Sequence, residues 1–234
     1  LYVPTTLMLL GLIARGVSFD FRSKAAAPQK GLWNTLFFVG SLLTSLTQGY
    51  MLGRYIMGFS HDWMAQCFSC LTALALTGGY AVLGCGWLIH KTSAALQTSF
   101  INIMPHLCHA LILFVLLIYV STPVFLPFIS QRWLHMPDIL IHILMPVISI
   151  CALVATGRFC RHMPLSGDQY SWLPWVMTMG VFVVCFHGLA FSMYPYIIPE
   201  TMDIWQAAAD PATLDMILWG VVLVLPCVLC YTVM

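Results

Sequence analysis

The stretch IMPHLCHALILFVLLIYVSTPVF, residues 103–125, decides the fold class of this chain. It contains no Asp, Glu, Lys or Arg, and its length suits the hydrocarbon core of a bilayer, which a helix of about 20 apolar residues crosses. Its polarity does not alternate, as it would in a strand of a membrane barrel. The stretch therefore predicts a transmembrane helix.

Similar apolar windows with few or no charges recur along the whole chain. The predicted spans are residues 1–14, 36–56, 67–89, 103–125, 139–156, 176–198 and 214–234. A spanning segment must satisfy its backbone polar groups internally, which a helix does. We therefore expect an all-α polytopic membrane protein, a transmembrane helix bundle with six full spans and one truncated span. It would form a single integral-membrane domain over residues 1–234.

The composition argues against two other classes of protein. Hydrophobic residues make up 61% of the chain and charged residues 7%, whereas soluble proteins average about 45–50% and about 25%. The mean hydropathy is +0.92. A net charge of +1 provides no basic field that could hold a nucleic acid backbone. We expect lipid contact and no nucleic acid partner.

The basic residues predict the orientation in the membrane. Seven of the nine fall in connections on one side and two on the other. The first group is Arg15, Arg22, Lys24, Lys30, Lys91, Arg158 and Arg161, and the second is Arg54 and Arg132. Because basic residues are retained on the cytoplasmic side, the first group is predicted to be cytoplasmic. The C-terminus of the last span is then cytoplasmic as well.

The densest polar segment is RGVSFDFRSK, residues 15–24. One interpretation is an ordinary basic anchor whose side chains reach the membrane surface. In the other, Arg15 and Asp20, with Gly16 breaking the helix between them, face inward as a charge pair at the mouth of a proton path. Ionisable groups near the membrane interior are usually functional. We predict Arg15 and Asp20 as the proton-path residues.

The histidines and cysteines raise the question of a metal site. His106, His109, His142 and His187 lie inside predicted spans, and a haem in a helical bundle is held by imidazole. No Glu-x-x-His pair accompanies them, so we expect helix-to-helix hydrogen bonds and no metal bound by this chain. Most of the nine cysteines lie in apolar runs, where they are expected to pack as small hydrophobic side chains.

Three function classes remain open on the residues alone. A transporter or channel would also be polytopic, but it should show repeats and polar side chains near the membrane centre, which we do not find. A stand-alone haem-b cytochrome would use some of the four histidines. A purely structural membrane subunit would use neither the histidines nor the Arg15 and Asp20 pair.

Three motifs resemble a known family, subunit II of cytochrome bd-type ubiquinol oxidases, including the cyanide-insensitive group. RGVSFDFR, residues 15–22, resembles its RGVxFxFR signature, and GYAVLGCGWLIHKT, residues 79–92, resembles its GxxxWLxxKT segment. YPYIIPETMDIWQAAADP, residues 194–211, resembles its final outer loop and the start of its last helix. There Asp210 should cap a helix with Pro211 in the first turn.

The resemblance implies a fold and a cofactor arrangement. The family has about nine helices, two four-helix bundles plus one, and this sequence would be its C-terminal part without the first two helices. Haem b and haem d, or a second type of haem b, are ligated by subunit I, which also carries the quinol site. The resemblance thus implies no catalytic residue and no haem ligand in this chain.

The resemblance also implies partners, a location and a role. The chain would form a heterodimer with subunit I in the bacterial plasma (inner) membrane, in contact with lipids, and a small single-helix subunit is a further candidate partner. It would support subunit I and a cytoplasmic-side proton path for the reduction of O2 to water. Arg15 and Asp20 match family positions associated with that path. Asp20 would relay protons, and Arg15 would favour its charged form.

Overall fold

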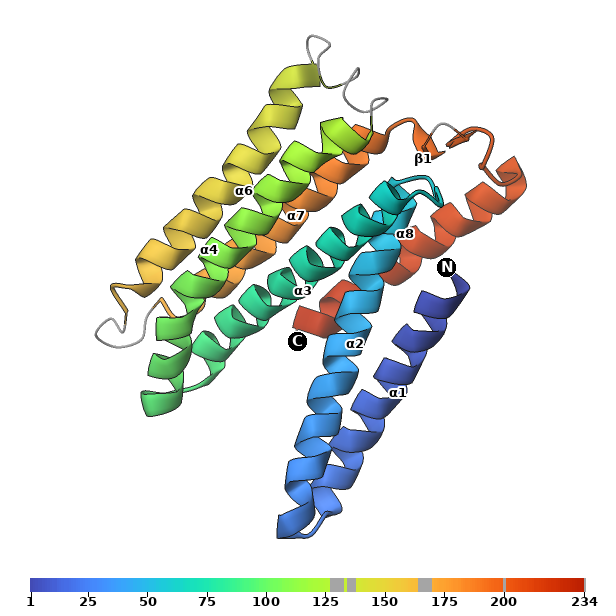
Figure 1. The fold of residues 1–234 in the computed structure, drawn as a ribbon. Coiled ribbons are helices and arrows are strands. Elements are labelled where there is room, and N and C mark those ends of the chain that lie inside the picture. Colours follow the sequence, from blue (N-terminus) through green and yellow to red (C-terminus); the bar gives the residue numbers. More distant parts are fainter. Residues whose placement is uncertain (127–132, 134–137, 164–169, 200, 234) are drawn as a thin grey trace. The chain divides into compact units, whose positions relative to one another are not determined.

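The computed structural model describes residues 1–126, 133, 138–163, 170–199 and 201–233. Two compact units are present, Leu1–Tyr194 and Pro195–Met234. The helices of the first unit are α1 (Tyr2–Lys24), α2 (Lys30–Ile56), α3 (Trp63–Lys91), α4 (Ala94–Phe125), α6 (Asp138–Cys160) and α7 (Leu173–Met193) (Figure 1). With α8 (Pro211–Val233), seven helices of the described part are long and apolar enough to cross a membrane. The prediction of an all-α polytopic membrane protein is confirmed.

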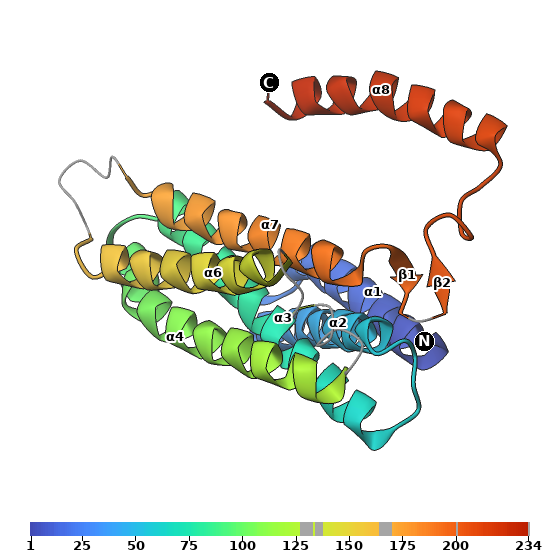
Figure 2. The same ribbon diagram turned by 90° about the horizontal axis from the view of Figure 1, so that it is seen from above.

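Helices that follow one another in the first unit pack side by side, as Figures 1 and 2 show. In addition, α3 packs against α7, so α3 contacts α2, α4 and α7. The larger core cluster contains Val82 and Ile89 of α3, Met104 of α4, Leu153 of α6 and Val181 of α7. The core therefore lies where α3, α4, α6 and α7 meet.

Most helices extend beyond the apolar windows that predicted them. The first helix continues from the predicted window, residues 1–14, to Lys24, and α4 begins at Ala94 rather than at residue 103. A hydropathy window detects only the part of a helix that lies in hydrocarbon. Polar residues at the ends of the same helix are solvated at the membrane surface, and they need not end the backbone hydrogen bonding.

The prediction that residues 176–198 form one helical span is wrong at its C-terminal end. The helix α7 ends at Met193, and Tyr194 has an extended backbone with ψ 137°. Pro195 follows, and a proline restricts the residue before it to such a conformation and lacks an N–H for the helix. Residues Tyr196–Ile198 instead form strand β1.

The second unit contains a short hairpin and one helix. Strand β1 pairs antiparallel with β2 (Met202–Asp203), with Tyr196 opposite Asp203. The helix α8 begins at Pro211, and the Ala212 N–H donates to Asp210 Oδ2 at 3.3 Å. The predicted cap at Asp210 is confirmed.

Glycines allow α1, α2 and α3 to pack closely. A Cβ on Gly11 would lie 2.8 Å from the Gly40 carbonyl oxygen, and one on Gly40 would lie 2.8 Å from the Gly11 carbonyl oxygen. A Cβ on Gly49 would lie 2.6 Å from Ala73 Cα, and there the Thr72 hydroxyl donates to the Gly49 carbonyl at 3.0 Å. Small residues at such contacts are the usual means by which membrane helices approach closely.

Many Ser and Thr hydroxyls within the spans donate to a carbonyl four residues earlier in the same helix. Examples are Thr44 to Gly40 at 2.8 Å, Thr122 to Ile118 at 2.7 Å, Ser149 to Met145 at 3.0 Å and Thr156 to Ala152 at 2.8 Å. A hydroxyl in hydrocarbon without such a partner would cost several kcal/mol. These helices therefore satisfy these polar side chains internally.

Candidate functional site at the basic end of α1 and α2

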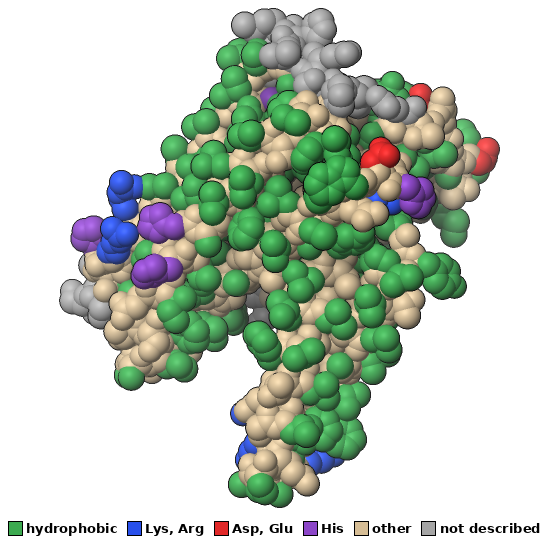
Figure 3. Space-filling view, in the orientation of Figure 1, with side chains coloured by type: hydrophobic (Ala, Val, Ile, Leu, Met, Phe, Trp, Pro, Cys, Tyr) green, Lys and Arg blue, Asp and Glu red, His purple; other side chains and the backbone are tan. Residues whose placement is uncertain are grey.

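The predicted site lies where α1 and α2 are joined by a short 3-10 turn, η1 (Ala27–Gln29). The rings of Phe21 and Trp33 stack across the two helices at 5.3 Å, and Arg22 Nε donates to Asn34 Oδ1. Lys and Arg side chains gather at this closed end of the hairpin (Figure 3). These contacts hold the end of α1 against the start of α2.

Arg15 lies on the side of α1 that faces α2. Its guanidinium carbon is 5.5 Å from the centroid of the Phe37 ring, within the range of a cation–π interaction. Its carbonyl accepts the Ser18 hydroxyl at 2.9 Å, and Ser18 is fully buried. Arg15 thus has a defined contact with α2.

Asp20 lies further toward the end of α1, and its side chain is exposed in this chain. The helix continues through Gly16, so the expected interruption between Arg15 and Asp20 is not present. Five residues along a helix correspond to a rotation of about 140° and a rise of about 7.5 Å. The structure does not bring the two charges together, and the Asp20 carboxylate has no hydrogen bond or ion pair with a described residue.

Three of the four histidines inside the predicted spans bond to their own helices. Nδ1 of His106, His109 and His187 bonds to the carbonyl four residues earlier in its own helix. The pocket beside His109 has a volume of about 200 Å³, below the about 300–1,000 Å³ of typical ligand pockets. Among the residues described, no group of three or more His, Cys, Asp or Glu could hold a metal ion.

His142 is the buried histidine of α6, and aromatic and hydroxyl groups surround it. Its ring stacks on Trp133 at 5.2 Å, and its Nδ1 is 3.4 Å from the Ser192 hydroxyl. Trp133 also stacks on Tyr119 at 5.1 Å and donates from Nε1 to Ser192. These contacts join α4, α6 and α7, which is the helix-to-helix role predicted for histidine.

Two further groups of residues bear on the sequence predictions. All nine cysteines are free. Arg158 and Arg161, at the end of α6, line one pocket with His109 of α4. The spacing of these residues in the sequence did not indicate this proximity, because it depends on how α4 and α6 pack. Arg132, which entered the orientation argument, lies outside the described residues.

Comparison with known proteins identifies the family. The profile of the family described as cytochrome bd terminal oxidase subunit II matches residues 1–234. A search of the curated proteins gives no match. The family is that of a terminal oxidase subunit, which implies an oxidoreductase complex that contains haem and a partner subunit. This multi-pass membrane chain belongs to the family of cytochrome bd terminal oxidase subunit II.

Proposed function

We propose that the chain is the second membrane subunit of a quinol:dioxygen oxidoreductase of a respiratory chain. It supports the partner, subunit I, which holds haem b and haem d or a second type of haem b, and it helps deliver cytoplasmic protons for the reduction of O2 to water. The family match over the whole chain carries this proposal.

The proton path would begin at the basic end of the α1–α2 hairpin. Water formation consumes protons inside a low-dielectric interior, and ionisable side chains and water are needed to bring them there. Asp20 is exposed and its carboxylate has no partner among the described residues. Such a carboxylate is available to take a proton from water and pass it on.

Arg15 would serve the path through its place in the hairpin and not by contact with Asp20. Its guanidinium lies over the Phe37 ring of α2, a cation–π contact that helps to fix α1, and with it Asp20, against α2. Arg15 is therefore proposed as a positioning residue of the path.

The test is Asp20→Asn in the full-length complex with its partner. Oxygen consumption with quinol would be measured from pH 6 to pH 8, and the optical haem spectrum would show whether the complex has assembled. We expect turnover to fall by about tenfold or more, because proton transfer by a placed side chain is usually worth at least that factor. Asp20→Glu, which keeps a carboxylate, should restore most of the turnover.

Asp62→Asn is the matched control. Asp62 is exposed at the start of α3, at the other end of α2, and accepts the Ser60 hydroxyl at 2.8 Å. Asn replaces Asp well at the start of a helix, so turnover should not change. Normal turnover of assembled Asp20→Asn complex at every pH would refute the role of Asp20 and leave family membership intact.

A further inference from the structure

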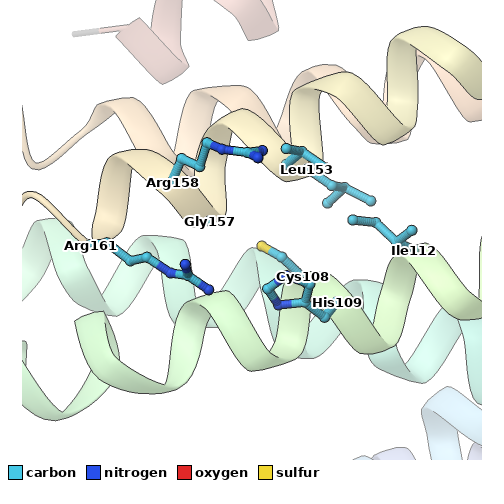
Figure 4. Close-up of a pocket in the computed structure, with 8 residues that line it drawn as sticks. Cys108, His109, Ile112, Leu153, Gly157, Arg158 and Arg161 are labelled. Atoms are coloured by element: carbon cyan, nitrogen blue, oxygen red, sulfur yellow. The ribbon is translucent and has the colours of Figure 1, made fainter.

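The pocket between α4 and α6 lies toward the basic end of these helices, where Arg and His side chains gather (Figure 3). Its volume is about 200 Å³. The lining residues are Cys108, His109, Ile112, Leu153, Val154, Gly157, Arg158 and Arg161. Figure 4 shows Arg161, in the turn directly after α6, extending toward Cys108 and His109, and Arg158 extending along α6 toward Leu153. Both guanidinium groups therefore border one space.

Neither guanidinium has a partner in the described chain. Arg158 and Arg161 form no side-chain hydrogen bond or ion pair with a described residue, and none of the eight lining residues is acidic. The other described arginines do have partners. Arg54 donates to the Phe59 carbonyl at 3.1 Å, Arg22 donates to Asn34, and Arg15 lies over Phe37.

The end of α6 does not need these two side chains for its own carbonyls. The backbone N–H of Arg161 donates to the Arg158 carbonyl at 3.2 Å, and that of His162 donates to Phe159 at 3.0 Å. Met163 N–H donates to Cys160 at 3.1 Å. Within the described residues, the donors of both guanidinium groups, five on each, are therefore not used by the protein.

The opposite wall of the pocket is apolar. Along α6, Leu153 and Val154 lie one turn deeper than Arg158, and along the antiparallel α4, Ile112 lies one turn deeper than His109. The pocket therefore has its cations toward the end of α6 and hydrocarbon side chains toward the middle of α4 and α6. A ligand that matches it carries an anionic oxygen group joined to an apolar chain.

We propose that this pocket binds the phosphate group of an anionic phospholipid, such as phosphatidylglycerol, whose acyl chains follow α4 and α6 into the bilayer. Guanidinium groups bind phosphate through paired hydrogen bonds. Basic pockets between helices on the cytoplasmic side of membrane proteins bind anionic lipid headgroups, and the basic residues predict that side for this end of α6. The small volume suits a headgroup and not a whole ligand.

The first test uses the wild-type complex with its partner subunit, freed of lipid in mild detergent. Binding of added phosphatidylglycerol, phosphatidylcholine and inorganic phosphate would be followed by native mass spectrometry. Phosphatidylglycerol should bind at the lowest concentration, and inorganic phosphate should not displace it at equal concentration. Equal binding of phosphatidylcholine, or displacement by inorganic phosphate at that concentration, would overturn the proposal.

The second test changes the two arginines. Arg158→Gln and Arg161→Gln should each weaken phosphatidylglycerol binding by about fivefold, and the double variant by about 25-fold, since each basic side chain near an anionic lipid surface contributes about that factor. The matched control is the double variant Lys24→Gln and Lys30→Gln, which removes the same charge from the end of the α1–α2 hairpin. Its binding should stay within about twofold of wild type.

If both double variants lose phosphatidylglycerol affinity equally, the lipid is attracted to the basic face in general. That result would overturn the proposal of a specific site. If the double Gln variant does not assemble, Arg158→Lys with Arg161→Lys replaces it. Lysine keeps the charges and loses the paired geometry, so phosphatidylglycerol should bind more weakly than in wild type and still better than phosphatidylcholine. Unchanged affinity in this variant would refute the guanidinium contacts.

Discussion

The α1–α2 contact and the α4–α6 contact both contain a glycine, but the two contacts differ in how closely the helices approach at that glycine. A Cβ on Gly11 of α1 would lie 2.5 Å from Thr44 Oγ1, whereas one on Gly157 of α6 would lie 3.6 Å from Pro105 Cα. The first glycine lets two backbones approach with no space between them. The second lies beside a pocket of about 200 Å³. Close packing thus fixes the hairpin that carries Asp20, and looser packing leaves room for a ligand.

The largest expected effect follows from filling the close contact. Gly40→Leu would place a side chain against the Gly11 carbonyl oxygen and the Arg15 nitrogen, at 2.8 Å and 3.0 Å from its Cβ. Backbone atoms cannot move aside as a flexible side chain can, so α1 and α2 must separate. We expect a cost of about 3 kcal/mol, seen as a lower Tm and a lower yield of assembled complex.

Gly31→Leu is the control for that variant, because a Cβ on Gly31 meets nothing within 4 Å. It adds the same side chain to the same helix. If both leucine variants assemble as wild type does, the close contact of α1 and α2 is not important for assembly.

A smaller effect is expected where a hydrogen bond joins two closely packed helices. Thr72→Val removes the donor to the Gly49 carbonyl and keeps the shape of the side chain. Hydrogen bonds between membrane helices contribute about 0.6 kcal/mol on average, so Tm should fall slightly. Thr98→Val, which removes a bond at 3.1 Å to Ala94 within the same helix, should change Tm less, and an equal fall would contradict a role for the bond between helices.

The smallest effect is expected at the looser contact. Gly157→Ala puts a Cβ at ordinary contact distances, 3.6 Å from Pro105 Cα and 3.7 Å from Cys108 Cβ. Alanine also favours a helix over glycine by up to about 1 kcal/mol. Thermal unfolding of the complex should therefore show an unchanged or raised Tm, whereas Gly11→Ala should lower it. An equal fall in Tm in the two variants would show that the two contacts do not differ in closeness of packing.

Hydropathy alone was enough to predict the fold class and every described span. Hydrocarbon requires long apolar helices, and such segments are visible in the sequence. Hydropathy did not indicate where α7 ends. Pro195 lies just beyond the last residue of α7 within an apolar stretch, and it ends the helix because of its ring and its missing N–H, not because of its polarity. The cap at Asp210 could be predicted because it depends on two neighbouring residues.

The sequence indicates candidate site residues, whose role stays a prediction, and it does not indicate their geometry. Arg15 and Asp20 were found as a polar segment, but the sequence suggested a break at Gly16, and the structure has a continuous helix there. Glycine is tolerated in membrane helices when neighbouring elements support them. The pocket with Arg158, Arg161 and His109 could not be predicted, since it requires the packing of α4 on α6.

The hydroxyl groups that bond within their own helices have a consequence for biogenesis. Thr122, Ser149 and Thr156 have their hydrogen bonds as soon as α4 and α6 are wound. A newly made helix therefore needs no neighbour to satisfy these groups when it leaves the translocon. Lateral entry into lipid can come first, and the choice of neighbours, including the partner subunit, can follow in the bilayer.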